Sequence, residues 1–266
     1  MVAARLPRSW SAALDQLRRD VVFVRGRLAG VKPSPVIRGL RYRPGADELA
    51  AVPRAAAAPR ELVVARVVRE SPDAVTLVLE DPHRSPLTFS PGQFFTVLTS
   101  IDGETVPRNY SASNTPGGRE LHLTIKRKRS KPGARLRALR PPGAGVAAPA
   151  TGPRRLVLHG GGVGVTPLAS ILRAVLASEP HAEVALVYGN RREQDIVFAG
   201  ELEALAREHR GRFTVVHVLE QPPEGWDGEV GRLDRATTSR VLDALAIAAA
   251  PGAEFFVCGP DGMQAE

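Results

Sequence analysis

The sequence predicts an all-β plus α/β architecture, in which a small antiparallel β-barrel precedes a doubly wound parallel sheet. Between residues 61 and 126, segments rich in β-branched residues are separated by Gly and Pro, which is typical of a small antiparallel barrel. After residue 153, short apolar strands alternate with segments of helical periodicity, which indicates a parallel sheet covered by helices. A chain of 266 residues with 43% hydrophobic residues is long enough to form two cores.

The first 60 residues are predicted to be a basic extension that ends in a linker. Ten Lys or Arg and two acidic residues lie in 1–44, which accounts for the whole net charge of +8. Segment 9–19 has its large apolar residues at helical spacing, whereas 31–60 is rich in Pro and Ala, as linkers are. A basic tail suits an acidic membrane surface, nucleic acid or an acidic partner. We expect a solvated tail with at most weak membrane-surface contact and no nucleic-acid binding.

Cysteine and histidine usage excludes several kinds of site. Cys258 is the only cysteine, so the chain can form neither an intramolecular disulfide nor a Cys-ligated iron–sulfur cluster. The six histidines show no metal-ligand spacing, and we expect no metal. No apolar run reaches the length of about eighteen residues that a membrane-spanning helix needs, and no secretory signal is recognisable, so we expect a soluble, cytoplasmic protein. The sequence has no Gly-x-Ser-x-Gly elbow of the kind that would indicate a hydrolase.

The predicted barrel covers residues 61–152 and contains a run of residues suited to a flavin. Its strands are ELVVARVVRE, AVTLVLED, the segment that ends in RNYS, and ELHLTIKRK. Arg108 offers a guanidinium for a phosphate, Tyr110 a phenol to lie along a flat ring, and Ser111 a hydroxyl for a ring heteroatom. A surface arginine beside a tyrosine that only covers the barrel mouth would give the same pattern.

The predicted α/β part covers residues 153–266. The strands RRLVLH, EVALVYGN, RFTVVHVL and EFFVC alternate with helices expected at about 167–178, 192–209 and 237–249. Ligands of doubly wound sheets bind at the carboxyl ends of the strands, and the glycine-containing motifs of this chain lie at such ends.

The glycine cluster GGGVGVTP, residues 160–167, lies between a predicted strand and a predicted helix. Gly161, Gly162 and Gly164 let the backbone approach a pyrophosphate, and the following helix N-terminus offers free amides to it. Thr166 adds a hydroxyl, and Pro167 lies near the first helical position, where its missing amide costs nothing. The pattern suits a dinucleotide, although an ordinary tight turn would also use such glycines.

Polar residues follow the second predicted strand of the α/β part. Asn190, Arg191 and Arg192 lie where the adenosine ribose of a dinucleotide would lie. Two adjacent arginines favour a 2′-phosphate, and hence NADPH over NADH. The alternative is that they only begin a solvated helix, so either coenzyme stays open.

Four motifs together resemble those of the ferredoxin–NADP reductase family. They occur in the order RNYS, GGGVGVTP, YGNRREQDIVFAGELEAL and VCGPDGM, and the resemblance covers roughly residues 60–266. The closest likeness is to reductase components that supply electrons to oxygenases or desaturases. Each motif alone is weak evidence, and their joint order carries the assignment.

The resemblance implies a role for each motif residue. Tyr110 and Ser111 would lie at the flavin ring and Cys258 at the nicotinamide, as the residues closest to the chemistry, while Arg108 would bind the FAD phosphate. The remaining cofactor contacts would come from the barrel residues Ser113, Ile125 and Lys126 and from the last motif, Gly259, Pro260 and Met263.

The chain departs from the family pattern after the strand that ends in TIKR. The family has a Gly-x-x-Ser-x-x-Leu element there, whose helix holds the flavin pyrophosphate. Here the basic run KRKRSK, residues 126–131, passes directly into PGARLRAL, which is predicted to be the next loop and strand of the barrel. The basic residues between 126 and 140 could bind the pyrophosphate by charge, dock an acidic partner, or be solvated. The last motif also begins a helix that family members continue past the equivalent of Glu266.

The predicted function is that of an FAD-containing, NAD(P)H-dependent reductase. Electrons would pass from the coenzyme through FAD to a separate acceptor protein, such as a ferredoxin or an oxygenase or desaturase component. Two alternatives stay open: a degenerate family member that acts as a nucleotide-binding or regulatory module, and a reductase that uses free flavin as a loosely held substrate.

Overall fold

The computed structural model describes residues 60–101, 104–126, 136–139, 154–245, 252–260 and 263. The predictions for the extension and most of its linker, and those for the basic residues 127–135 and Arg140, lie outside these residues. Among the residues described, no helix is both long and apolar enough to cross a membrane.

The first part of the described chain is antiparallel β-structure, as predicted. Its strands are β1 (Arg60–Glu61), β2 (Val63–Ser71), β3 (Ala74–Glu80), β4 (Phe94–Ile101), β5 (Glu104–Ser111), β6 (Glu120–Lys126) and β7 (Leu136–Leu139). They form one sheet in the order β1-β7-β4-β5 and another in the order β2-β3-β6. An isolated bridge between Ala112 and Leu123 joins the end of β5 to β6.

A single apolar cluster fills the space between these two sheets. Alternate residues of β3, β4 and β6 point into it, which is the period of a strand with one buried face. Phe89 and Phe95 pack edge to face in this cluster with their ring centroids 5.8 Å apart. Tyr110 packs against the cluster from β5 and is half-buried.

Strand β7 is the strand that the sequence predicts after the basic run. It pairs with β4, where Thr96 lies opposite Leu139, and with β1, where Arg60 lies opposite Ala138. Only the nine residues 127–135 connect the end of β6 to the start of β7.

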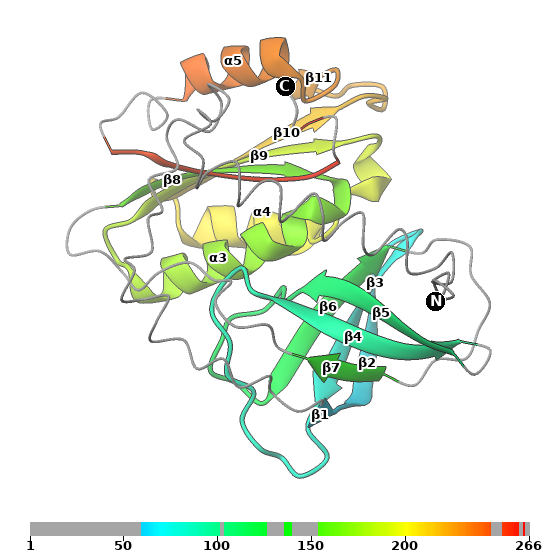
Figure 1. The fold of residues 1–266 in the computed structure, drawn as a ribbon. Coiled ribbons are helices and arrows are strands. Elements are labelled where there is room, and N and C mark those ends of the chain that lie inside the picture. The colour runs from blue at the N-terminus through cyan, green and yellow to red at the C-terminus, as the bar shows by residue number, and fades with distance from the viewer. Residues whose placement is uncertain are drawn as a thin grey trace, which may run out of the picture. The chain divides into compact units, whose positions relative to one another are not determined.

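The second part of the described chain is a five-stranded parallel sheet with helices on both faces, as predicted (Figure 1). Its strands are β8 (Arg155–Gly161), β9 (Glu183–Asn190), β10 (Phe213–Leu219), β11 (Glu229–Val230) and β12 (Glu254–Cys258), in the order β11-β10-β9-β8-β12. Helices α3 (Val165–Ser178) and α4 (Ala199–Glu208) cover one face, and α5 (Arg235–Ala244) covers the other.

The helix predicted at 192–209 is shorter in the structure. Residues 193–195 form one 3-10 turn, η3 (Glu193–Asp195), and α4 begins only at Ala199. Ile196, Val197 and Phe198 between them are buried in the core that α3 and α4 share. Phe198 has a left-handed backbone, with φ 64°, which interrupts the helix. Burial of these three apolar side chains therefore overrides the local helical pattern.

The helix predicted at 237–249 is also displaced, because α5 begins at Arg235. The carboxylate of Asp234 accepts a hydrogen bond of 2.9 Å from the backbone N–H of Thr237, as a helix N-cap does. The sequence offers this cap in Asp234-x-x-Thr237, and the prediction missed it. Residues 246–251 lie outside the described part of the chain.

Candidate functional site

The glycine, asparagine and cysteine motifs meet at one edge of the parallel sheet. Cys258 at the end of β12 lies opposite Gly160 of β8, and Gly161 of β8 lies opposite Gly189 of β9. Because the strands are parallel, their carboxyl ends form a continuous edge, where α/β sheets bind ligands. The structure therefore brings together three motifs that are far apart in the sequence.

The glycine cluster forms a tight turn, η2 (Gly162–Gly164), between β8 and α3. Gly162 has φ 52°, and a β-carbon built there would meet nothing within 4 Å, so its outer side is open. The hydroxyl of Tyr188 donates a hydrogen bond of 3.0 Å to the Gly162 carbonyl, and burial raises the pKa of this phenol. The turn is thus held from the β9 side while its other side stays accessible.

Two other glycines of the cluster pack against the last motif. A β-carbon at Gly161 would lie 2.9 Å from atoms of both Pro260 and Met263, and one at Gly164 would lie 2.3 Å from the Cys258 carbonyl oxygen. Side chains are therefore excluded at both positions. The close approach that the structure shows at these two glycines is to the last motif of the chain itself, and the approach of a pyrophosphate to the cluster stays a prediction.

Helix α3 begins directly after the turn and has no side-chain cap at its N-terminus. Thr166 is its second residue and is buried, and Pro167 is its third, where its missing amide removes no intrahelical bond. The first amides of α3 consequently have no side-chain acceptor at the cap position. An anion can be bound by such amides.

A cleft of about 790 Å³ opens at this edge of the sheet. Its volume falls in the range of small-molecule and cofactor sites. The side-chain Nδ2 of Asn190, a residue that lines the cleft, is buried and has no hydrogen-bond partner among the described residues. The cleft residues that the sequence predicts are Gly161, Gly162, Asn190, Arg191, Arg192, Pro260 and Met263, together with Lys126 of the barrel.

The two arginines after β9 differ in their surroundings. Both are exposed at the cleft, but the Nε of Arg192 donates a hydrogen bond of 2.9 Å to the side-chain oxygen of Gln221. That bond gives Arg192 a preferred orientation. The Arg191 side chain is exposed beside it, so both charges are available at the end of β9 where the sequence predicts the coenzyme ribose.

Some charged side chains of the cleft could not be recognised in the sequence. Arg232 forms an ion pair of 3.5 Å with Glu220, and Asp73 forms one of 3.1 Å with Lys126. Arg232 follows the two-residue strand β11, whose sequence gives no strand signal of its own. Asp73 lies in the turn between β2 and β3 and looks like an ordinary turn residue.

The flavin motif lies on the last residues of β5. Arg108 is exposed, and its Nη1 donates a hydrogen bond of 2.9 Å to the carbonyl of its neighbour Pro107, so the guanidinium stays at the surface. Ser111 is half-buried at the strand end, opposite Phe94. These donors fit a ligand with a phosphate and a flat polar ring, which is the chemistry that the sequence predicts.

The turn Ser90–Gln93 supports the end of β5. The fully buried side chain of Gln93 accepts a hydrogen bond of 2.9 Å from the Ser90 backbone N–H, and the Gln93 carbonyl accepts one of 2.8 Å from the Ala112 N–H. Gly92 has φ 77°, which the turn requires. This turn thus lies directly beside the end of the flavin motif, with Gln93 bonded to Ala112 and Phe94 opposite Ser111.

Ser113 is buried in the segment that follows β5, whereas Ile125 is less enclosed. The Ser113 hydroxyl accepts a hydrogen bond of 3.1 Å from the Thr124 hydroxyl and donates one of 3.2 Å to the His122 carbonyl. Only 1% of the residue is exposed. Ile125 is half-buried on β6, next to the exposed Lys126. A contact of Ser113 with a cofactor would therefore use its backbone.

Cys258 is half-buried, and burial raises the pKa of its thiol. A raised pKa keeps the thiol neutral near pH 7, so it can pack beside an uncharged ring but is a poor nucleophile. Within the part of the chain that the structure describes, no three His, Cys, Asp or Glu side chains are grouped as metal ligands.

The family model described as "Oxidoreductase NAD-binding domain" matches residues 158–266. Ferredoxin–NADP reductase B of Sorangium cellulosum is 31% identical over 205 residues, which are 73% of this chain and 83% of that protein. The ferredoxin reductase component of 3-ketosteroid-9-alpha-monooxygenase from Mycolicibacterium smegmatis is 35% identical over 218 residues, 75% of this chain and 58% of that protein.

A third relative, NADH-cytochrome b5 reductase 1 of Laccaria bicolor, is 31% identical over 206 residues, 73% of this chain and 66% of that protein. This chain thus spans less than two thirds of the length of the fungal and mycobacterial relatives. Among solved structures, the cytochrome b5 reductase domain of Ulva prolifera nitrate reductase shares the fold, with a TM-score of 0.68 at 20% identity over 78% of this chain and 89% of that one. The chain belongs to the ferredoxin–NADP reductase family of oxidoreductases, as the order of its four motifs predicts.

Proposed function

We propose that this protein is an FAD-dependent NAD(P)H oxidoreductase that passes electrons to a separate acceptor protein. The observation that carries the proposal is the cleft at the carboxyl ends of the parallel strands, which the glycine turn, Asn190 and the last motif line together. Several relatives support it by name, among them the ferredoxin reductase component of the mycobacterial monooxygenase and a component of 1,2-phenylacetyl-CoA epoxidase from Escherichia coli. We also propose that the acceptor is a ferredoxin or an oxygenase or desaturase component, and that the protein is cytoplasmic.

The α/β part, residues 153–266, would hold the nicotinamide coenzyme. Gly161 and Gly162 would admit a pyrophosphate to the backbone, and Thr166 would add a hydroxyl at the start of α3, which no side chain caps. The buried Nδ2 of Asn190 supplies a donor that a ribose or phosphate oxygen would satisfy. Cys258 ends β12 beside the turn and, together with the following Gly259, would border the nicotinamide.

The barrel, residues 61–152, would hold the flavin. Arg108 offers an exposed guanidinium to a phosphate, and Tyr110 and Ser111 offer a ring face and a hydroxyl two and three residues on. FAD held by these residues would supply the chemistry of accepting a hydride from the reduced nicotinamide and passing its electrons on to an acceptor. The protein's part is to bind the two rings side by side and to keep a neutral thiol, that of Cys258, next to them.

We also propose that the protein prefers NADPH to NADH as its coenzyme. Arg191 and Arg192 are exposed at the end of β9, and Arg232 lines the same cleft. Three guanidinium groups around one cleft favour a ligand that carries an additional phosphate.

A yellow colour and coenzyme oxidation test the proposal together. The purified protein should show the two visible absorption bands of a flavin, release FAD on denaturation, and reduce ferricyanide with NADPH as the donor. A colourless protein that neither takes up added FAD nor oxidises either coenzyme would contradict it and favour the nucleotide-binding module.

The short connection between β6 and β7 favours a second candidate, a reductase that uses flavin as a loosely held substrate. Its nine residues, 127–135, carry no Gly-x-x-Ser sequence of the kind that, by the family resemblance, begins the helix for the FAD pyrophosphate. A colourless protein that oxidises NAD(P)H only when flavin is added, with FMN nearly as effective as FAD, would select this candidate.

A further inference from the structure

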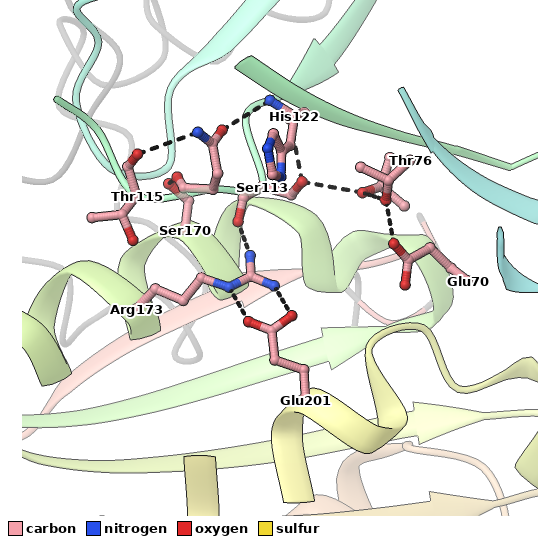
Figure 2. Close-up of polar contacts among 10 residues, drawn as sticks. Glu70, Thr76, Ser113, Thr115, His122, Ser170, Arg173 and Glu201 are labelled. Carbon is pink, nitrogen blue, oxygen red and sulfur yellow. Dashed lines mark hydrogen bonds and ion pairs between the residues drawn. The ribbon is translucent and has the colours of Figure 1, made fainter. Parts of the chain in front are cut away.

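We infer that Ser170 and Arg173 of α3 are positioning residues. They hold the residues that follow β5, the strand with the flavin motif, against α3, which begins at the glycine turn η2. The Ser170 hydroxyl donates a hydrogen bond of 2.8 Å to the Asn114 carbonyl, and Nη1 of Arg173 donates one to the Ser113 carbonyl. The two donors are three residues apart and therefore lie on the same face of α3. They bind two consecutive carbonyls that follow β5 (Figure 2).

The Arg173 guanidinium is itself held in one orientation. Its Nε and Nη2 donate to the two carboxylate oxygens of Glu201, each at 2.6 Å, and its central carbon lies 4.7 Å from the centroid of the Phe198 ring. This bidentate, stacked arrangement leaves Nη1 directed at Ser113 (Figure 2). Lysine has neither the fork nor the plane and could not reproduce it.

The segment that Arg173 and Ser170 bind is also fixed from the barrel side. The Asn114 side chain accepts a hydrogen bond of 2.9 Å from the His122 N–H, and the Ser113 N–H donates one of 2.9 Å to the His122 carbonyl. The Ser113 hydroxyl continues to Thr124, whose hydroxyl lies 2.8 Å from that of Thr76 (Figure 2). A displacement at Ser113 would therefore be transmitted into β3 and β6.

If the proposed function holds, this contact would set the distance between the flavin and the nicotinamide, because of where its residues lie in the chain. Ser111, expected at the flavin ring, is two residues before Ser113, and Gly164, beside Cys258, directly precedes α3. Helix α3 therefore begins at the glycine turn η2, and Ser170 and Arg173, which together form a clamp on the residues after β5, lie within about its first three turns. The separation of the two rings depends on that clamp, and hydride transfer is sensitive to errors of about 1 Å.

A kinetic experiment separates positioning from binding. In Arg173→Gln and Ser170→Ala, the rate of anaerobic flavin reduction by NADPH should fall about tenfold or more, while the Kd values for FAD and NADPH stay within about twofold. Glu201→Gln keeps the bond to Ser113 but loosens the guanidinium, so its rate should be intermediate. Arg240→Ala is the matched control, because it removes an arginine of helix α5 that forms an exposed ion pair with Glu229 of β11, and it should behave as wild type.

A second measurement needs no cofactor. Hydrogen–deuterium exchange of the apoprotein should be faster for peptides spanning 111–116 in Arg173→Gln and Ser170→Ala, and unchanged in Arg240→Ala. If the wild type neither binds FAD nor oxidises NAD(P)H, the proposed function fails while this measurement still tests the clamp. Flavin reduction at the wild-type rate in both clamp variants, or exchange identical to wild type, would overturn the inference.

Discussion

Gly164 lies against the backbone of Cys258 so closely that a β-carbon at position 164 would be 2.3 Å from the Cys258 carbonyl oxygen. The same β-carbon would lie 2.8 Å from the α-carbon of Gly259. Backbone on both sides leaves no flexible side chain that could give way. The glycine turn and the end of β12, two of the motifs that identify the family, are thus joined by a contact that only glycine permits.

Gly164→Ala should therefore lower the free energy of unfolding by about 1–3 kcal/mol, the usual cost of overpacking, and weaken coenzyme binding. Urea unfolding and coenzyme titration measure the two effects. Gly200→Ala is the control, because a β-carbon there meets nothing within 4 Å and alanine favours the helix α4, so it should be neutral or stabilising by up to about 1 kcal/mol. A Gly164 variant as stable as the control would show that the turn can shift at no cost.

Arg108→Ala should weaken FAD binding by about 1.5–3 kcal/mol, the value of a hydrogen bond to a charged group. Arg108 is suited to this role because its guanidinium is exposed and is held near the strand by the carbonyl of its neighbour Pro107. Flavin fluorescence during titration measures the affinity. Arg119→Ala, which changes another exposed arginine, in the turn before β6, should leave FAD affinity unchanged, and equal affinity in both variants would remove Arg108 from the flavin site.

Replacing Arg191 and Arg192 together by alanine should raise the KM for NADPH by about tenfold or more and leave that for NADH nearly unchanged. The reason is that only NADPH carries the 2′-phosphate that two exposed guanidinium groups at the end of β9 would bind. Steady-state kinetics with both coenzymes tests this. The double variant Arg207→Ala/Arg210→Ala removes the same charge from the far end of α4 and should change neither KM. Equal effects on both coenzymes would mean that Arg191 and Arg192 are only a solvated segment.

His159 should make the protein less stable as the pH falls below about 6.5. Burial lowers the pKa of its imidazole to about 4, and its Nε2 has no hydrogen-bond partner among the described residues, whereas the unfolded chain takes up a proton at about pH 6.5. The unfolded state therefore binds more protons between pH 6.5 and 4, and this one group should cost about 2 kcal/mol between pH 7 and 5.

Urea unfolding of the wild type and of His159→Gln at pH 7 and pH 5 isolates this contribution. The loss between the two pH values should be smaller in the variant by about 2 kcal/mol. His217, whose pKa burial also lowers, remains in both proteins and cancels in the comparison. Identical losses would show that His159 is hydrated or partnered in solution.

The motif residues could be assigned to one edge of the sheet from the sequence because they follow strands. A parallel sheet brings the carboxyl ends of its strands to one edge, so Gly161, Asn190 and Cys258 were expected at the same edge once the alternation of strands and helices was recognised; the strand order that makes them neighbours came from the structure. The start of α4 was predicted wrongly at about residue 192, since burial of the segment 196–198 against the core is a property of the folded chain. The periodicity of apolar residues within one segment does not show which part of that segment the rest of the fold will bury.

The sequence by itself determined the fold class, the family, and which residues end each ligand-binding strand, because each of these follows from local patterns and short motifs. Only the tertiary structure decided the contacts between segments far apart in the chain. Ser170 and Arg173 look like ordinary polar residues of a helix, yet they bind carbonyls 56 and 60 residues earlier. Arg232 and Asp73 likewise line the cleft, the first from the segment after the short strand β11 and the second from the turn between β2 and β3. Such contacts depend on how the sheets and helices pack in the folded chain, and no spacing within one segment encodes that.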